Sequence, residues 1–218
     1  GKGRTGGNPS VGCIIVKQGR VIGRGWTQPG GRPHAEAMAL AQAGAAAAGA
    51  TVYVTLEPCA HQSERGPSCA DSLVAAKPAR VVAAITDADP RTAGRGFAAL
   101  KAAGITVTQP VLADSARTGL AGFFSRIEKQ RPHFTLKLAT SLDGCIAMAD
   151  SSSRWITGAA ARAHTHLERA RCDAILVGAG TVKADQPSLN VRIPGLESRS
   201  PRRIMLGSGA APDGWEVI

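Results

Sequence analysis

Aromatic side chains are scarce in this 218-residue sequence, at 4% with a single tyrosine, while alanine and glycine abound. Hydrophobic residues nevertheless make up 44%, which is enough for a packed core and argues against a disordered chain. The length exceeds that of a usual single domain, so one large domain or two modest ones would fit. We therefore expect a globular α/β protein whose core is built largely of small residues.

Several other features are absent. No apolar run is long enough to cross a bilayer, and the N-terminus lacks the pattern of a secretion signal, so we expect a cytoplasmic protein with no membrane partner. The five cysteines are an odd number, which without a secretion signal favours metal binding or buried thiols over disulfides. The net charge is +10, but the arginines form no basic block. That scatter weakens a nucleic-acid interpretation without removing it, and phosphorylated small-molecule partners or an excised piece of a more balanced protein would also account for the charge.

The segments PHAEAMAL and TLEPCAHQSERGPSC contain a pattern typical of a catalytic metal site. His34, Cys59 and Cys69 can hold zinc through three protein ligands, which leaves the fourth tetrahedral position for water. Glu36 follows His34 by two residues and is the expected proton shuttle between that water and a substrate. The pattern matches the zinc deaminase signature H-x-E…P-C-x-x-C, except that nine residues separate the two cysteines here. Metal-assisted hydrolysis is therefore indicated, and the substrate is not.

Hydrophobic patterning places these residues in an α/β sandwich with a partly parallel sheet. It predicts strands over 11–16, 21–26, 51–56, 80–86 and 105–108, and helices over 34–48, 69–76 and 97–103. Glycines in the second strand would let another backbone come close. His34 and Glu36 fall on the first turn of a helix, whose N-terminal partial charge would help to keep Glu36 ionised. Asp87 and Asp89 follow a strand, at the edge where such folds bind ligands.

The second half has its own strand and helix pattern after a charged, proline-ended connector at 128–132, so we place domains at 1–128 and 129–218. A helix over 114–126 precedes the connector. Beyond it we expect strands over 134–139 and 174–177, with a helix near 159–171 between them. A glycine-rich turn over 178–181 opens a short helix and could receive a phosphate on its amides. This turn alone is weak evidence for a dinucleotide.

The series NPSVGCIIV, PHAEAMAL, TLEPCAH, GPSCADSL and TDADPRTAGRGFAALKAAGI resembles the deaminase half of the bifunctional riboflavin-biosynthesis deaminase/reductase family. The resemblance implies a cytidine-deaminase-like α/β/α sandwich in which His34, Cys59 and Cys69 bind zinc and Glu36 moves protons. It also implies the substrate 2,5-diamino-6-ribosylamino-4(3H)-pyrimidinone 5′-phosphate, which loses its 2-amino group as ammonia. The expected ring, ribose and phosphate contacts are Asn8, His61, Arg65, Asp87 and Asp89.

The later series KLATSLDG, SRWITG, ERARCDAILVGAGTVKADQPSLNVR and PRRIMLGS resembles the reductase half of the same family. It implies a dihydrofolate-reductase-like α/β domain that uses NADPH to reduce the ribosyl chain to ribityl. The residues matching cofactor-contacting positions are Ala139, Trp155, Thr157, Thr181, Asp185 and Ser208. Those matching substrate-contacting positions are Ser153, Arg169, Leu189 and Arg192. The family continues beyond the position of Ile218, so we expect a partial reductase domain. We also expect a homo-oligomer.

Three alternatives stay open at the level of sequence. His61 could complete a structural zinc site as a fourth ligand, because structural sites use four protein ligands. A zinc deaminase of a free base or nucleoside could carry a C-terminal domain that serves only for oligomerisation. A basic nucleic-acid-binding protein with a structural zinc would belong to a different class, and its binding would be sensitive to salt.

Overall fold

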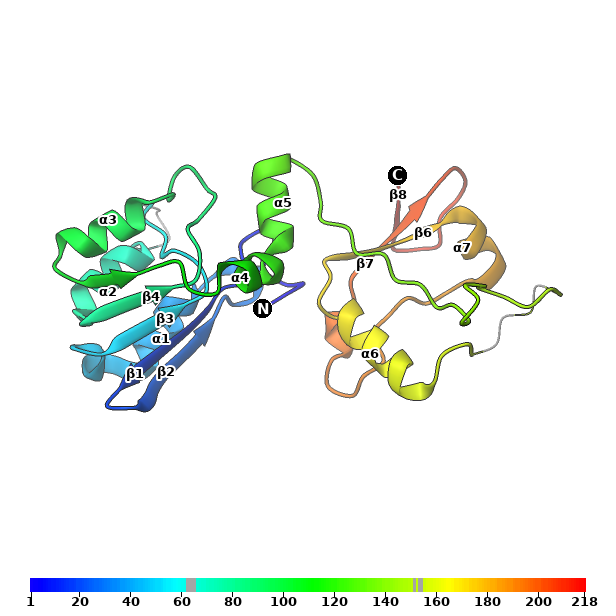
Figure 1. Cartoon of the computed structure of the whole chain (residues 1–218). Coiled ribbons are helices and arrows are strands. Elements are labelled where there is room, and N and C mark those ends of the chain that lie inside the picture. The colour runs from blue at the N-terminus through cyan, green and yellow to red at the C-terminus, as the bar shows by residue number, and fades with distance from the viewer. Residues whose placement is uncertain (62–65, 151, 153–154) are drawn as a thin grey trace. The chain divides into compact units, whose positions relative to one another are not determined.

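The computed structural model describes residues 1–61, 66–150, 152 and 155–218. The chain divides into two compact units, which are described separately (Figure 1). Unit 1 comprises Gly1 and Thr5–His133, and unit 2 comprises Lys2–Arg4 and Phe134–Ile218. Among the described residues, no helix combines the length and the apolar character that a bilayer span requires.

Unit 1 is built on a mixed five-stranded sheet with the strand order β2-β1-β3-β4-β5. The strands are β1 (Gly12–Lys17), β2 (Arg20–Trp26), β3 (Thr51–Val54), β4 (Arg80–Ala83) and β5 (Thr106–Thr108). β1 runs antiparallel to both β2 and β3, whereas β3, β4 and β5 are parallel. The parallel strands therefore end at one edge of the sheet, and the loops that follow β3 and β4 start there.

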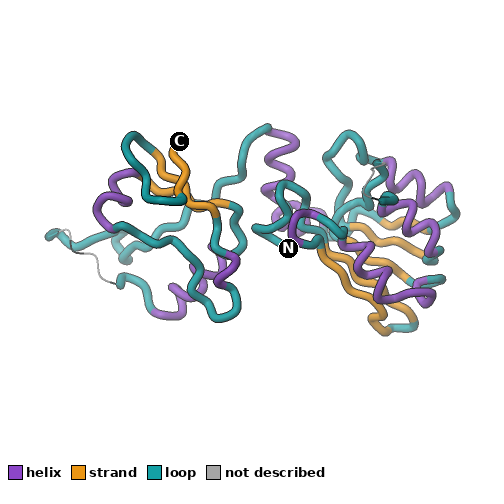
Figure 2. The backbone as a smooth tube through the Cα atoms, turned by 180° about the vertical axis from the view of Figure 1, so that it is seen from behind, coloured by secondary structure: helices purple, strands orange, loops and turns teal. Residues whose placement is uncertain are grey.

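Helices cover one face of this sheet. They are α1 (Ala35–Ala43), α2 (Cys69–Ala76) and α3 (Arg95–Ala102), which lie side by side (Figure 2). The alternation of side chains along the strands selects the covered face. In β1, Cys13 and Ile15 are fully buried, whereas Ile14 between them is 42% exposed on the opposite face. The buried face supplies most of the core of unit 1.

The first helix lies almost directly on the second strand, as the glycines in that strand predict. A Cβ added to Gly25 would lie 2.0 Å from the carbonyl oxygen of Ala35, and one added to Gly23 would lie 2.3 Å from that of Ala39. Both distances are far below van der Waals contact, so no larger residue fits at either position without moving the helix. The expectation that another backbone approaches these glycines is confirmed.

Two predicted helices of unit 1 have different bounds in the structure. The helix predicted over 34–48 ends at Ala43, because Gly44 takes a positive φ of 54° and a 3-10 turn, Gly44–Ala47, follows. The helix predicted over 114–126 is two helices, α4 (Ala113–Gly119) and α5 (Ala121–Lys129). The break lies at Leu120, whose side chain is buried in the core together with that of Phe124.

Unit 2 contains a three-stranded parallel sheet with the order β6-β7-β8. Its elements are α6 (Ala159–Arg169), β6 (Ala174–Gly178), α7 (Ala179–Asp185), a 3-10 turn (Glu197–Arg199), β7 (Arg202–Leu206) and β8 (Trp215–Val217). The buried apolar residues are few, and they are Ala170, Val182, Val191 and Met205. The strand and helices predicted between 159 and 185 are present, within two residues at their ends.

The strand predicted over 134–139 is wrong. The segment has no regular secondary structure, and Phe134, Leu136 and Leu138 are 67%, 81% and 63% exposed. Its alternating apolar residues have the period of a strand, but no described strand pairs with it. A strand needs a neighbour for its backbone hydrogen bonds, and sequence alternation alone cannot supply one.

The contact between α1 and β2 predicts a large effect for a single methyl group. Gly25→Ala should lower the free energy of unfolding by about 3 kcal/mol, because the added methyl overlaps the helix backbone. Gly12→Ala is the matched control, since a Cβ at this strand position meets its nearest neighbour at 3.8 Å. Urea unfolding of both variants measures the difference, and equal stabilities would contradict the packing described.

Candidate active site

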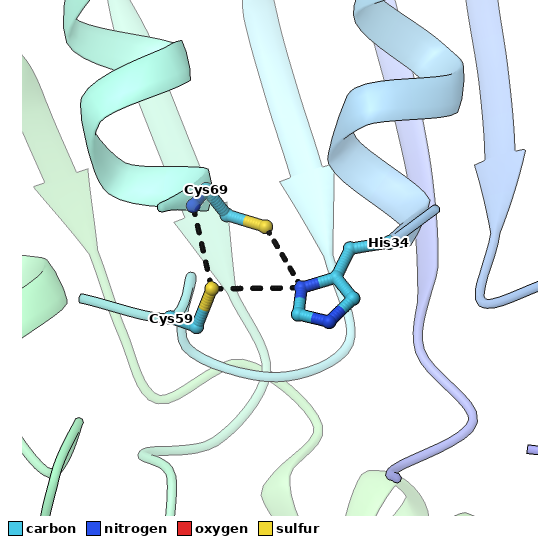
Figure 3. A group of neighbouring side chains, drawn as sticks. All are labelled: His34, Cys59 and Cys69. Atoms are coloured by element: carbon cyan, nitrogen blue, oxygen red, sulfur yellow. Dashed lines mark hydrogen bonds between the residues drawn. The ribbon is translucent and has the colours of Figure 1, made fainter. Parts of the chain in front are cut away.

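Three potential metal ligands meet at one point in unit 1. The ligand atoms of His34, Cys59 and Cys69 all lie within 4.8 Å of one another. His34 Nδ1 is 3.2 Å from Cys69 Sγ and 3.5 Å from Cys59 Sγ, and the three side chains point toward a common centre (Figure 3). Among the described residues, the group has no fourth member, whether histidine, cysteine or acidic residue.

Secondary structure holds each ligand in place. His34 immediately precedes α1 as its N-cap residue, and Cys69 is the first residue of α2. Ser68 caps α2 by accepting a hydrogen bond from the Asp71 amide at 3.1 Å. Cys59 lies in the loop after β3. The group therefore forms where two helices begin and a central strand has just ended.

The donor set and its spacing fit zinc. One imidazole nitrogen and two thiolates are typical ligands of this ion, and tetrahedral bonds to them place the donor atoms about 3.5 Å apart. The two nitrogen–sulfur distances of 3.2 and 3.5 Å agree with that spacing. Three protein ligands with one open position are characteristic of a catalytic zinc, whereas a structural zinc is enclosed by four.

The surroundings of the two thiols favour a thiolate. The Cys69 amide, at the N-terminus of α2, donates to Cys59 Sγ at 3.3 Å. Hydrogen bonding from Cys69, with a further contribution from His34, lowers the pKa of Cys59 to about 4. The same contact with Cys59, together with burial, raises the pKa of Cys69. Cys59 is therefore the thiol that loses its proton first, and a helix terminus stabilises the negative charge.

Glu36 lies on the first turn of α1 and is only 3% exposed. Burial is the main cause that raises the pKa of this carboxyl to about 7, and hydrogen bonding to backbone opposes the shift. Hydrogen bonding to backbone at the start of α1 favours the ionised carboxylate, in the direction expected for a helix N-terminus, and burial acts against it. A carboxyl whose pKa is near neutrality can both accept and return a proton, which suits general acid–base catalysis.

A pocket connects these groups with the edge of the sheet. Its lining consists of Pro9, Val11, Thr27, His34, Glu36, Leu56, Glu57, Cys59 and Asp87. Asp87 enters from the loop after β4, as expected for a residue at the carboxyl end of a parallel strand. Burial raises the pKa of Asp87 to about 6. The pocket therefore contains a second acidic group, Asp87, besides Glu36.

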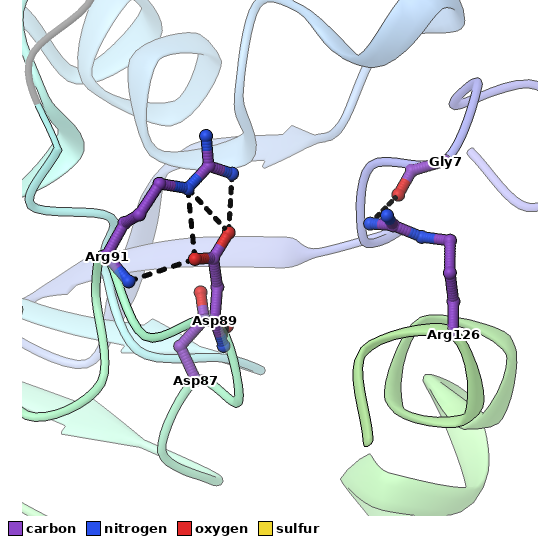
Figure 4. A network of polar contacts seen from close by, with 5 residues as sticks. All are labelled: Gly7, Asp87, Asp89, Arg91 and Arg126. Carbon is purple, nitrogen blue, oxygen red and sulfur yellow. Dashed lines mark hydrogen bonds and ion pairs between the residues drawn. The ribbon is translucent and has the colours of Figure 1, made fainter. Parts of the chain in front are cut away.

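Asp89 lies beside Asp87 and already has a partner. Arg91 donates to Asp89 through Nε at 3.0 and 3.1 Å, and the Asp89 amide donates to Asp87 at 2.8 Å (Figure 4). The Arg91 guanidinium lowers the pKa of Asp89 to about 2. Asp89 is consequently an ionised, arginine-bound group next to the pocket, whereas Asp87 is the buried acid within it.

The remaining residues predicted for the deaminase site have different surroundings. Asn8 is exposed on the loop before β1, which Arg126 ties to α5 by donating to the Gly7 carbonyl at 2.8 Å (Figure 4). His61 is half-buried, and its Nδ1 has no hydrogen-bond partner among the described atoms. Neither residue is among the described lining of the pocket. Arg65 lies outside the described residues.

In unit 2, the predicted cofactor residues lie on several segments. Thr181 is in the first turn of α7 and Ser208 follows β7, so both lie at the carboxyl edge of the parallel pair β6 and β7. Asp185 is the last residue of α7. Ala139 is half-buried in the irregular segment that follows α5. Trp155 and Thr157 precede α6. Arg162 of that helix stacks 4.3 Å above the Trp155 ring and donates to the Thr157 carbonyl.

Two of the four predicted substrate residues of unit 2, Arg169 and Arg192, lie around the end of α6. Arg169 donates to the Asn190 carbonyl at 2.6 Å, and the Arg192 side chain donates to the Asn190 side chain at 3.0 Å. The Arg192 amide donates to His166 Nδ1 at 3.2 Å, so a histidine that the sequence did not single out joins the two arginines. Leu189 adjoins them in sequence with a positive φ of 50°. Ser153 lies outside the described residues.

Sequence reasoning also missed two buried polar groups of the pocket, Glu57 and Thr27. The Thr27 hydroxyl donates to the Pro9 carbonyl and accepts from the Val11 amide, each at 2.9 Å, and so fixes the loop before β1. The Glu57 carboxylate accepts from backbone amides 30 or more residues away. A buried threonine and a glutamate next to a proline carry no periodic signal, so only the folded chain reveals their partners.

The ligand geometry predicts the metal content of the purified chain. We expect about one zinc per chain, with a large loss in Cys59→Ala and in Cys69→Ala. Cys13→Ala is the control, because Cys13 is a buried thiol of the same unit outside the ligand group. Metal analysis by mass spectrometry decides the matter, and zinc that persists after loss of either ligand cysteine would contradict this site.

The pair Asp89 and Arg91 predicts a dependence on pH. The folded pKa of Asp89, about 2, lies below its ordinary value of 3.8, so the stabilisation is present above pH 3.8 and disappears as the pH falls towards 2. Since Arg91 is 69% exposed, the pair contributes less than about 1 kcal/mol. Carboxyl NMR titration of Arg91→Gln should show the Asp89 pKa rising towards 3.8. Arg95→Gln should leave it low, and an unchanged value in Arg91→Gln would refute the pairing.

Comparison with known proteins links both units to one family. The family model described as the cytidine and deoxycytidylate deaminase zinc-binding region matches residues 1–85, and the model of the RibD C-terminal domain matches residues 132–214. Riboflavin biosynthesis protein RibD of Escherichia coli K12 is 47% identical over 200 residues, which cover 92% of this chain and 54% of that protein. RibD of Mycobacterium tuberculosis H37Rv is 44% identical over 221 residues, covering 100% and 65%.

Solved structures give the same result. The diaminohydroxyphosphoribosylaminopyrimidine deaminase/5-amino-6-(5-phosphoribosylamino)uracil reductase of Thermotoga maritima superposes with a TM-score of 0.89 at 37% identity, covering 100% of this chain and 64% of that one. Acinetobacter baumannii RibD gives 0.83 at 44% identity, covering 96% and 60%.

The chain therefore spans between about half and two thirds of the length of these relatives. The matches confirm the predicted fold class, a cytidine-deaminase-like domain followed by a dihydrofolate-reductase-like domain. Because the similarity extends through both units, the chain belongs to the family of RibD riboflavin-biosynthesis proteins.

Proposed function

We propose that this chain is a zinc-dependent deaminase of riboflavin biosynthesis, with the deaminase domain at 1–128 and a partial NADPH-dependent reductase domain at 129–218. Its substrate would be 2,5-diamino-6-ribosylamino-4(3H)-pyrimidinone 5′-phosphate. The observation that carries the proposal is the meeting of His34, Cys59 and Cys69 at one point, next to a pocket that is lined by His34, Cys59 and the buried Glu36. The description of the Thermotoga maritima relative as a deaminase/reductase supports the choice of substrate.

The reaction requires a water molecule to replace an amino group on the pyrimidine ring. When bound by His34, Cys59 and Cys69, zinc would lower the pKa of a coordinated water and orient it in the pocket. Glu36 accepts a proton from the attacking water and delivers a proton to the departing amino group. A carbon–oxygen bond forms, the carbon–nitrogen bond breaks, and ammonia leaves. The raised pKa of Glu36 matches a group that must both take and give a proton at neutral pH.

Recognition of the substrate falls to the edges of the pocket. Asp87 lies inside it and can hydrogen-bond a ring amino group, while Asn8, His61 and Asp89 belong to neighbouring loops of the same unit. Asp89 forms an ion pair with Arg91, whose exposed guanidinium offers positive charge near the pocket. We assign the 5′-phosphate to cationic side chains of these loops, with Arg65 as the candidate that sequence similarity points to.

The second domain would reduce the ribosyl chain of the deaminated product to ribityl. NADPH, when bound, would supply the hydride. Thr181 and Ser208 lie at the carboxyl edge of β6 and β7, where parallel α/β sheets bind cofactors. Arg169 and Arg192 offer two guanidinium groups beside Asn190, in keeping with a phosphorylated substrate.

The proposal includes two properties of the whole protein. We place it in the cytoplasm as a homo-oligomer that binds a phosphorylated pyrimidine. Exposed apolar side chains such as Trp26 and Tyr53 on the sheet of unit 1 offer surface for self-association. Sedimentation velocity that shows a single chain at micromolar concentration would contradict the assembly.

Ammonia release tests the proposed activity. The chain should release ammonia from the diaminopyrimidine phosphate, and Glu36→Gln should lower kcat about 1000-fold because the proton shuttle is lost. The variant should keep its zinc, since Glu36 is outside the ligand group. Glu197→Gln, in an exposed turn of unit 2, is the matched control and should retain full activity.

The same incubation with NADPH separates the two activities, because NADPH oxidation is followed independently of ammonia. Ammonia without oxidation would assign deamination alone to this chain. Equal turnover of cytidine would favour a deaminase of nucleosides instead. If neither ammonia nor oxidation appears, the assignment is wrong.

A further inference from the structure

Glu57 is a buried carboxylate that the mechanism does not use. It is only 2% exposed, lies two residues before the ligand Cys59, and contributes to the lining of the pocket. A buried carboxylate is costly unless hydrogen bonds compensate for its lost hydration. The partners of Glu57 therefore show what the residue holds in place.

Three backbone amides supply that compensation. The Asp87 amide donates to Glu57 Oε2 at 3.2 Å, and the Gly94 amide donates to the same oxygen at 3.0 Å. The Phe97 amide donates to Oε1 at 3.2 Å. These amides come from both ends of one segment, the loop after β4 and the first turn of α3. Glu57 thus closes the segment 87–97 by binding its start and its end.

The arrangement also completes the N-terminus of α3. Gly94 is the N-cap residue of this helix and provides no side chain, so the first amides of the helix depend on an acceptor from elsewhere. The backbone next to Glu57 packs closely against α3, which brings the Glu57 carboxylate within reach of these amides. The closeness is shown at Gly96, where an added Cβ would lie 2.1 Å from the Pro58 carbonyl oxygen. The loop that carries Glu57 and Cys59 is consequently pressed against the start of α3.

The segment held in this way carries the acidic side chain of the pocket. Asp87 lines the pocket, and its carboxylate accepts from the Asp89 amide at 2.8 Å, so both residues move with the loop. In addition, the Glu57 amide donates to the Ile85 carbonyl at 2.9 Å, just before the loop begins. The backbone and the side chain of Glu57 therefore both determine where Asp87 lies.

We propose that Glu57 is a positioning residue of the deaminase site, which sets substrate affinity by fixing the loop that carries Asp87 through three backbone hydrogen bonds. This inference rests on the proposed deaminase function. Glu57 would act on KM through the loop, whereas Glu36 acts on kcat through the proton. The zinc ligands would be unaffected, since no donor to the Glu57 carboxylate belongs to them.

Replacement of Glu57 separates positioning from general stability. Glu57→Leu removes all three acceptors and should raise KM for the diaminopyrimidine phosphate about tenfold, the loss expected for one well-placed buried hydrogen bond, with kcat within about threefold. Glu57→Gln keeps one oxygen that can accept from Asp87 and Gly94, so KM should be partly restored. Leu100→Ala is the control, because Leu100 is fully buried on α3 and is not part of the pocket lining. It should lower stability without raising KM.

Amide hydrogen exchange provides a readout that does not need turnover. In the zinc-loaded full chain, the amides of Asp87, Gly94 and Phe97 should lose protection in Glu57→Leu, and only the Phe97 amide should do so in Glu57→Gln. Unchanged exchange at Asp87, or a KM increase in Leu100→Ala equal to that in Glu57→Leu, would overturn the inference. If Glu57→Leu does not fold, Glu57→Gln decides the matter. If the wild-type chain releases no ammonia, the proposed function fails, and exchange together with calorimetric binding of the same phosphate still tests the positioning.

Discussion

The direct contact between the backbone of α1 and strand β2 is the constraint on which the site depends. Gly23 and Gly25 remove the side chains that would hold the helix away, so α1 has one position on the sheet. That position sets where the helix begins, and His34 and Glu36 lie at this point. The metal ligand and the proton shuttle therefore share a single rigid support, because the helix packs against Gly25 at Ala35, the residue between them, and against Gly23 one turn further on at Ala39.

The other half of the site is organised by the edge of the parallel strands. Cys59 follows β3 and Asp87 follows β4, while Cys69 opens the helix between them. The N-terminus of α2 faces the Cys59 thiol, so a backbone amide and the partial positive charge of the helix lie where negative charge must be held. Burial raises the pKa of Glu36, whereas hydrogen bonding at the start of α2 lowers the pKa of Cys59. Two acidic groups of the same pocket therefore differ in how readily they lose a proton.

Much of unit 1 could be predicted from local sequence because its strands are short apolar runs and its ligands belong to a spaced motif. The close approach at Gly25 was also visible, since glycine in a strand has few other purposes. Non-local partners were not. The segment 134–139 has the alternation of a strand but no described partner, and the predicted helix is interrupted at Leu120, which has non-helical backbone angles (φ −111°, ψ 18°) and a side chain buried in the core. Glu57 was missed for the same reason, since its three donors lie 30 to 40 residues further along the chain.

Glu57, Pro58 and Cys59 are consecutive, and each makes a different contact. Glu57 accepts hydrogen bonds from amides of the loop and of α3, the Pro58 carbonyl packs against Gly96, and Cys59 belongs to the ligand group. A deletion or insertion of one residue here would disturb all three contacts at once. The spacing of these three residues along the chain is therefore a constraint on the site that is separate from the size or hydrophobicity of their side chains.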